Sequence, residues 1–311
     1  MILDTGCAGF IGSHLCERLL KENLNVIGVD NMNEYYDIKI KEDNIELLNS
    51  YNNFKFIKED TCTTQVIELY QPEIVVHLAS LAGVRNSIEN IGDYARNNIL
   101  SQINLLEQSR KIKIKKFIYA SSSSVYGLNK NVPFKETDNI NLQNSPYATS
   151  KLCIENYANL YQNLYKVQTI GLRFFTVYGP RGRPDMAPYK FLKSIHSDIT
   201  FKKFGDGRSY RDYTYIDDII DGIYNVINSN EKLSKIYNLG NSNPITLNKF
   251  IDICETVVNK KAIYDILPNQ QGDVPHTYSD ISLAKKELNY NPKISIEEGI
   301  ERTYKWILNS I

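Results

Sequence analysis

Three glycines near the start of the chain constrain its fold more than any other feature. Gly6, Gly9 and Gly12 follow the apolar residues 1–3 in the spacing G-x-x-G-x-x-G, which predicts a tight turn from a strand into a helix. Such a turn presents backbone N–H groups and the positive end of a helix dipole to an anion such as a diphosphate. By itself, the motif is also compatible with a tight turn and a helix cap that bind no ligand.

An acidic residue at the end of the next apolar run decides between these alternatives. Asp30 closes the strand candidate 25–30, near the distance of about 20 residues from the glycine turn at which a carboxylate holds an adenosine ribose. We therefore predict a dinucleotide site that includes Phe10, Ile11 and Asn31. Because Asp30 repels a 2′-phosphate and no arginine follows it at residues 31–33, the sequence favours NAD over NADP.

Composition narrows the range of partners. The 311 residues contain 36 basic and 36 acidic side chains, so no excess charge points to nucleic acid. We find neither a run of about 18 apolar residues nor a leader-like N-terminus, and we expect no membrane partner. The cysteines are odd in number (five) and form no C-x-x-C pair, which predicts reduced thiols and a cytoplasmic location rather than a disulfide framework or a metal site.

Short β-branched runs alternate with longer amphipathic segments through the first half of the chain. This alternation predicts an α/β fold with a doubly wound, mostly parallel sheet of the Rossmann type. We expect strands at 2–3, 26–30, 54–58, 74–77, 116–120 and 169–173, and helices near 12–21, 42–48, 64–70, 91–110 and 146–165. The regular alternation of strand and helix patterns ends after Tyr178. We predict a cofactor domain at 1–176, rejoined by a segment near 211–240, and a smaller lobe, mainly 177–311, that binds the substrate.

Tyr147 and Lys151 form the pattern Y-x-x-x-K. Pro146 suits the first turn of a helix, so the two side chains fall one turn apart on the same face. A phenol has a pKa of about 10 and needs a stabilised anion to act as a base at neutral pH. A lysine ammonium one turn away, together with a nicotinamide cation, would lower that pKa. A helix with an unrelated Tyr and Lys is the alternative for this motif in isolation.

A run of four serines follows the strand candidate 116–120. Residues at the carboxyl end of a parallel strand lie where ligands bind, so hydroxyls from this run would meet a substrate oxygen there. A serine in that position can hydrogen-bond the reacting oxygen and relay its proton to Tyr147. A serine-rich loop without chemistry is the alternative, and we expect at least two of the four serines to have only that role.

Together these motifs resemble the extended short-chain dehydrogenase/reductase family, and specifically its NAD-dependent sugar-nucleotide epimerases. The resemblance covers essentially the whole chain and is closest to the UDP-glucuronate 4-epimerases. It rests on residues 5–12, Asp30, Asp60, 77–79, 125–127, Tyr147, Lys151 and 211–218, with residues 30–37, 82–90 and 174–187 pointing to the glucuronate branch.

The resemblance implies roles at matched positions. Ser122 would be the catalytic hydroxyl, Tyr147 the base and Lys151 its electrostatic partner. Asp60 would meet the adenine amino group, and Thr61, Leu78, Ala79 and Asn98 would complete the cofactor site. On the substrate side, Arg211 would bind the UDP diphosphate, Arg85 would contact the substrate, and Asp273 would close the nucleotide pocket. Gln270 stands where hexose epimerases often carry arginine. Helices 91–110 and 146–165 would pair across a homodimer.

Two serines also bear on the reaction type. Related dehydratases need an Asp-Glu pair directly after the catalytic hydroxyl, whereas this chain has Ser123 and Ser124, which cannot perform that proton chemistry. Small hydroxyls there suit a carboxylate at the sugar C6, with Thr176 and Arg183 as further donors. A surface cation is the alternative for Arg183.

These observations predict NAD-dependent 4-epimerisation of UDP-glucuronate to UDP-galacturonate through a transient 4-keto sugar. Epimerisation of UDP-glucose or UDP-N-acetylglucosamine, and decarboxylation of UDP-glucuronate, remain alternatives. A non-catalytic NAD-binding protein is the alternative from another class. One residue departs from the family pattern: Asp4 lies at the end of the first strand, where relatives carry an apolar residue, usually valine. A carboxylate in a buried strand is costly unless it is paired.

Overall fold

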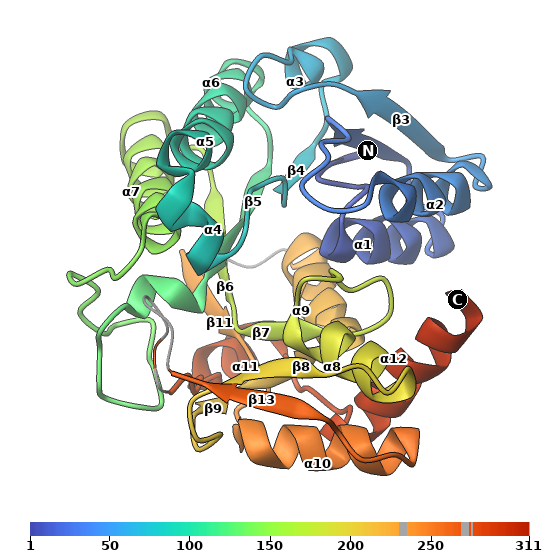
Figure 1. Ribbon diagram of the computed structural model, residues 1–311. Coiled ribbons are helices and arrows are strands. Elements are labelled where there is room, and N and C mark those ends of the chain that lie inside the picture. Colours follow the sequence, from blue (N-terminus) through green and yellow to red (C-terminus); the bar gives the residue numbers. More distant parts are fainter. Residues whose placement is uncertain (230–234, 269–273, 275, 311) are drawn as a thin grey trace.

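Seven strands form one parallel sheet, in the order β11-β6-β5-β4-β1-β2-β3 (Figure 1). The computed structural model describes residues 1–229, 235–268, 274 and 276–310. The strands of this sheet are β1 (Ile2–Thr5), β2 (Val26–Asp30), β3 (Phe54–Lys58), β4 (Ile74–His77), β5 (Lys116–Ser122), β6 (Thr169–Phe174) and β11 (Ile236–Leu239).

Alternate residues of the strands pack into two separate cores. Ile2 belongs to the core on one face of the sheet, and its neighbour Leu3 belongs to the core on the other. Successive side chains of a strand point to opposite faces, so both faces must be covered. The first core contains residues of α1 (Phe10–Lys21), α2 (Ile38–Asn49) and α9 (Ile216–Asn228), and the second contains residues of α3 (Val66–Tyr70), α6 (Ser101–Ile112) and α7 (Pro146–Tyr165). The predicted doubly wound sheet is confirmed.

The helix expected at 91–110 is divided. It consists of α5 (Ile91–Tyr94), a π-helical segment η1 (Ala95–Leu100) and then α6. By contrast, the strands expected at 26–30, 54–58 and 74–77 and the helix at 146–165 have the predicted bounds. Strand β5 extends two residues beyond the prediction, because Ser121 and Ser122 continue to pair with Arg173 and Phe174 of β6.

Strand β1 is also longer than expected, which changes the position of Asp4. The strand continues to Thr5, so Asp4 is not its last residue but pairs with Gly28 on one side and Val76 on the other. Asp4 is completely buried, and neither carboxyl oxygen has a hydrogen-bond partner among the described residues. Burial, and then the charge of Asp30, raise the pKa of the Asp4 carboxyl well above its usual range.

The later elements lie beside the carboxyl ends of the sheet (Figure 1). Two of them return to the first half of the chain: β11 pairs with β6, and α9 packs against α1. The domain boundary near residue 176 stays a prediction. The other elements are α4 (Val84–Glu89), η2 (Ser123–Tyr126), β7 (Thr176–Tyr178), α8 (Ala187–His196), β8 (Phe201–Phe204), β9 (Tyr210–Arg211), β10 (Tyr213–Tyr215), β12 (Ile245–Thr246), α10 (Leu247–Val258), β13 (Tyr264–Leu267), α11 (Ser282–Leu288) and α12 (Ile296–Ser310). Within the described ranges, no helix combines the length and apolar character needed to cross a membrane.

Candidate active site

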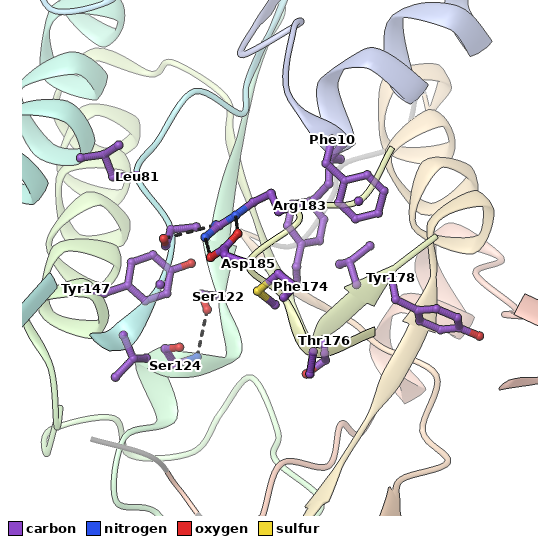
Figure 2. A pocket seen from close by; sticks show the side chains of 18 of the residues that line it. Phe10, Leu81, Ser122, Ser124, Tyr147, Phe174, Thr176, Tyr178, Arg183 and Asp185 are labelled. Carbon is purple, nitrogen blue, oxygen red and sulfur yellow. Dashed lines mark hydrogen bonds and ion pairs between the residues drawn. The ribbon is translucent and has the colours of Figure 1, made fainter. Parts of the chain in front are cut away.

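A cavity of about 1120 Å³ lies at the carboxyl ends of the strands and brings together most of the predicted site residues. Figure 2 shows part of its lining, with residues from α7, the end of β5 and the segment after β6 facing one another. The predicted residues that line it are Gly6, Gly9, Phe10, Ile11, Gly12, Asp30, Asn31, Thr61, Leu78, Ala79, Arg85, Ser122, Ser123, Ser124, Tyr147, Lys151, Thr176, Arg183 and Arg211.

The glycine turn leaves no room for side chains where the chain approaches itself. A Cβ at Gly12 would lie 2.2 Å from the carbonyl oxygen of Gly6, and one at Gly6, whose φ is +86°, would lie 2.7 Å from the backbone nitrogen of Ala79. Helix α1 begins without a side-chain cap and without an acidic residue in its first turn. Its first N–H groups and dipole therefore face the cavity uncompensated, which fits the diphosphate of a dinucleotide.

Asp30 lies at the end of β2, in the wall of the cavity, and has a partner that the sequence did not suggest. Its Oδ1 atom accepts a hydrogen bond from the backbone N–H of Met32 at 2.8 Å and lies 3.5 Å from the ammonium of Lys41. Lys41 comes from α2, is buried, and also donates to Asn33 at 3.0 Å. The carboxylate and the ammonium together can bind both hydroxyls of a ribose. No local motif marks Lys41, because the contact is made by a helix that folds back over the strand end.

The Tyr147–Lys151 pair is fixed by the start of α7. Ser145 caps the helix by accepting a hydrogen bond from Ala148, and Pro146 occupies its first turn. The Lys151 ammonium donates to the carbonyl of Ala120 at 2.8 Å and to the hydroxyl of Ser80 at 3.1 Å. It also lies 5.9 Å from the centroid of the Tyr147 ring. The helix therefore carries both groups into the cavity beside the end of β5.

Ser122 is the serine of the run that meets Tyr147. Its hydroxyl accepts a hydrogen bond from the backbone N–H of Ser124 at 3.1 Å, and its proximity to Tyr147 lowers the pKa of that phenol in part. Figure 2 shows Ser122 and the hydroxyl of Tyr147 directed into the same space. By contrast, Ser121 points away from the cavity centre and donates to Glu155 at 2.5 Å, in a buried network with Arg173. One serine of the run therefore has a structural role.

Electrostatics around the pair differ from the sequence expectation. Burial raises the pKa of Tyr147, while the nearby Ser122 side chain and the charge of Arg183 lower it in part. Burial also lowers the pKa of Lys151 to about 7, opposed by the charge of Glu155. In the chain by itself, desolvation therefore outweighs the stabilisation of a phenolate, and the lysine is held close to neutrality.

Arg183 is part of the cavity wall and not a surface cation. Its side chain is 14% exposed, and its guanidinium forms two bonds with Asp185, at 3.0 and 2.6 Å. It also donates from Nη1 to the carbonyl of Ala82 at 3.2 Å and stacks 5.0 Å from the centroid of the Tyr35 ring. Nη1 carries a second N–H, so the guanidinium can still donate to an anionic ligand.

Two of the predicted residues that the structure describes do not line the cavity. Asp60 does not line the cavity: its carboxylate contacts Arg96 at 2.6 Å and accepts from the backbone of Cys62 at 2.8 Å. Asn98 is buried behind the wall, where its amide bonds the backbone of Leu81 at 2.8 and 3.0 Å and so holds the loop after β4. Gln270 and Asp273 lie outside the described residues.

The cavity is also lined by residues of α8 and β8 that the sequence analysis did not identify. Lys190 of α8 and Lys202 and Phe204 of β8 all line the cavity. Arg85 lies 5.0 Å from the centroid of the Phe204 ring, so it reaches across the cavity from α4. Cations on this wall suit the phosphates of a nucleotide. These residues stand singly in short elements of mixed polar and apolar composition, so no sequence motif identifies them. No group of three or more potential metal ligands occurs in the part of the chain that the structure describes.

The doubly wound sheet, the glycine turn and the Ser122, Tyr147 and Lys151 set define an extended short-chain dehydrogenase/reductase. The sequence profile of the "NAD dependent epimerase/dehydratase family" matches residues 2–240, and the chain belongs to this family.

Individual relatives and one solved structure show which members of that family the chain is similar to. The chain is 44% identical to the UDP-glucuronate 4-epimerase of Thermodesulfobacterium geofontis, over 99% of this chain and 96% of the relative. It is 38% identical to a probable UDP-glucuronate 4-epimerase of Rhizobium meliloti, over 98% and 96%. A crystal structure of the Bacillus cereus UDP-glucuronic acid 4-epimerase, in complex with UDP-glucuronic acid and NAD, has a TM-score of 0.96. It is 37% identical and covers 100% of this chain and 99% of that one.

Proposed function

We propose that this protein is an NAD-dependent epimerase that converts UDP-glucuronate to UDP-galacturonate by inverting C4 through a transient 4-keto sugar. The observation that carries the proposal is the meeting of Tyr147, Ser122 and Arg183 in one cavity, with the glycine turn and Asp30 at its other end. Relatives similar over nearly their whole length are named for this reaction.

NAD fits the residues at the dinucleotide end of the cavity. The uncapped start of α1 would hold its diphosphate, Asp30 and Lys41 would hold the adenosine ribose, and Lys151 has an N–H left for the other ribose. When bound, NAD would accept a hydride from the sugar C4 and later return it to the opposite face.

The chain supplies the proton transfer. Tyr147 would take the proton from the sugar O4, and Ser122 would hold the phenol hydroxyl and sugar oxygen in line. The charge of Arg183 favours the phenolate, against the burial that disfavours it. Lys151, 5.9 Å from the ring centroid, would add to this effect when it is protonated. Since the 4-keto sugar must present both faces in turn, the wide cavity suits a rotation of the sugar within the site.

The glucuronate preference rests on the donors near the reacting end. Arg183 supplies a buried cation, and Ser123, Ser124 and Thr176 supply hydroxyls along the same wall. A charge-assisted hydrogen bond is worth about 1.5–3 kcal/mol, enough for tenfold discrimination from a single contact. Gln270 stays a proposed substrate-binding residue, and Asp273 keeps its proposed role of closing the nucleotide pocket. Asp60 at the adenine and Arg211 at the diphosphate also keep their proposed roles.

The alternatives differ in product. A UDP-hexose epimerase would not need Arg183, and a decarboxylase would release CO₂ from the 4-keto sugar and give a pentose. A firm hold on the carboxylate restrains that loss, which favours the epimerase. A non-catalytic NAD-binding protein would have no use for Tyr147, Ser122 and Lys151 together in one cavity.

We also propose a homodimer formed by α7 and the helix 91–112, with the protein in the cytoplasm. These helices are neighbours (Figure 1), and Leu100, Leu160 and Leu164 on them have exposed apolar side chains. Four helices from two copies would cover them. Leu160→Glu together with Leu164→Glu should give a monomer in analytical ultracentrifugation, whereas a parent protein that is already monomeric would contradict the proposal.

Arg183→Ala tests the assignment of the sugar. We expect the variant to lose at least tenfold in kcat/KM for UDP-glucuronate and to change little on UDP-glucose, because only the uronate has the carboxylate. Asp185→Ala is the matched control, since it frees the guanidinium without removing it. Equal losses of Arg183→Ala on both substrates would contradict a carboxylate-binding role.

A further inference from the structure

The loop between β7 and α8 carries Arg183 and begins with a turn in an unusual conformation. The backbone N–H of Gly182 donates to the carbonyl of Gly179 at 3.2 Å, with Pro180 and Arg181 between them. Arg181 has a φ of +59°, in the left-handed region. Proline followed by a residue of positive φ is the pattern of a type II turn, whose third position favours glycine. An arginine there is strained, so its side chain is expected to do something that glycine cannot.

The Arg181 side chain does not line the cavity and reaches α1. Its side chain is 12% exposed, and Nη2 donates to Oε2 of Glu17 at 2.6 Å. Nη1 is buried and has no hydrogen-bond partner among the described residues. Glu17 lies on the helix whose N-terminus faces the proposed diphosphate position, and Arg181 itself does not line the cavity. The contact therefore joins the cofactor helix to the loop that carries Arg183.

The loop that carries Arg183 also approaches α1 through Gly182. Strand β7 ends at Tyr178 and α8 begins at Ala187, so the loop has no regular structure of its own. Gly182 lies close to the Phe10 ring, since an added Cβ would be 3.9 Å from it. Arg183 follows directly, and its guanidinium binds Asp185 on the same loop and donates to the carbonyl of Ala82, in the segment before α4. A shift of the backbone at position 181 would move Arg183 by a similar amount.

We propose that Arg181 is a positioning residue for sugar selection. Its ion pair with Glu17 holds the loop against α1 at the position from which Arg183 reaches the C6 carboxylate of the substrate. Arg181 touches neither substrate nor cofactor and acts through Arg183, so the inference rests on the proposed role of Arg183. Glu17 is its partner, and the ion pair couples the dinucleotide end of the cavity to the choice of sugar.

Arg181→Gly separates this role from a purely structural one. Glycine suits the turn without strain, so a structural role alone predicts unchanged substrate selectivity. We expect instead that the ratio of kcat/KM for UDP-glucuronate to that for UDP-glucose falls at least fivefold and that a pentose product appears. Arg181→Lys, which keeps a cation for Glu17, should recover part of the ratio. Lys113→Gly is the matched control, because Lys113 also has a positive φ, at the end of α6.

A second variant covers the case in which Arg181→Gly does not fold. Glu17→Gln removes the charge of the partner with little change of shape, and it should lower the same ratio in the same direction. A ratio within twofold of the parent in Arg181→Gly or, failing that, in Glu17→Gln, with a reduced ratio in Arg183→Ala, would overturn the role of Arg181 alone. An unchanged ratio in Arg183→Ala would overturn the assignment of the sugar contact, and the positioning role with it.

Discussion

Replacing Asp4 by valine should stabilise this protein. The Asp4 side chain is fully buried in the middle of the sheet, and both of its oxygens lack partners among the described residues. An unsatisfied buried polar group costs about 1–3 kcal/mol, and valine would remove this penalty while adding an apolar contact. For a gain of about 2 kcal/mol, a chain of 311 residues should unfold roughly 3 °C higher.

The gain should depend on pH. Burial raises the pKa of Asp4 in the folded chain, so between the unfolded value of about 4 and the raised value the folded state binds more protons than the unfolded state. Stability of the parent then falls as pH rises, by at most about 1.4 kcal/mol per pH unit from this group. The valine variant lacks this pH dependence. The difference in stability between the valine variant and the parent should therefore grow above pH 4 until the pH passes the folded pKa of Asp4.

Urea unfolding of the parent, Asp4→Val and Asp4→Asn from pH 4 to 8 measures both effects. The asparagine variant is the control, because it removes the titration but keeps unsatisfied polar atoms. The reasoning is refuted if Asp4→Val is less stable than the parent, or if the difference between them is the same at every pH.

Three further substitutions test the site. Tyr147→Phe should keep the fold and lower turnover by about 10²–10⁴, since only the phenol oxygen can act as the base, and near-normal turnover would contradict this. Asp30→Ala should weaken binding of NAD and admit NADP in fluorescence titrations, because the carboxylate that repels a 2′-phosphate is removed while Lys41 remains; a parent that prefers NADP would refute it. Lys151→Met should abolish turnover yet stabilise the cofactor-free chain. Burial lowers the folded pKa of Lys151 to about 7, so the stabilisation should be largest below pH 7 and shrink as pH rises toward 10, and a gain that grows with pH would be inconsistent with that burial.

Local patterns predicted the parts of the molecule in which neighbouring residues decide the structure. The apolar runs of β2, β3 and β4, and Pro146 in the first turn of α7, gave bounds that the structure confirms. The glycine turn and Tyr147 were found from sequence because their spacing is fixed by a single turn of backbone. Most of the predicted site residues also line one cavity.

Contacts between distant elements could not be predicted. Lys41 reaches Asp30 because α2 folds back over the end of β2, and Arg181 reaches Glu17 because the loop after β7 crosses α1. Asn98, which lies in the π-helical segment η1, bonds the backbone of Leu81 in the loop after β4, a contact that no local pattern indicated. The pKa of Tyr147 was expected to be lowered, but burial, which depends on the whole fold, has the larger effect.

The central claim is the reaction itself, and one measurement tests it directly. Purified protein is incubated, without added NAD, with UDP-glucuronate and in parallel with UDP-glucose, and the products are followed by proton NMR. We predict that UDP-glucuronate is converted to a mixture with UDP-galacturonate, free of pentose, and that UDP-glucose reacts at least tenfold more slowly. A pentose as the main product, equal or faster conversion of UDP-glucose, or no turnover of either sugar by protein that contains bound NAD would contradict the account.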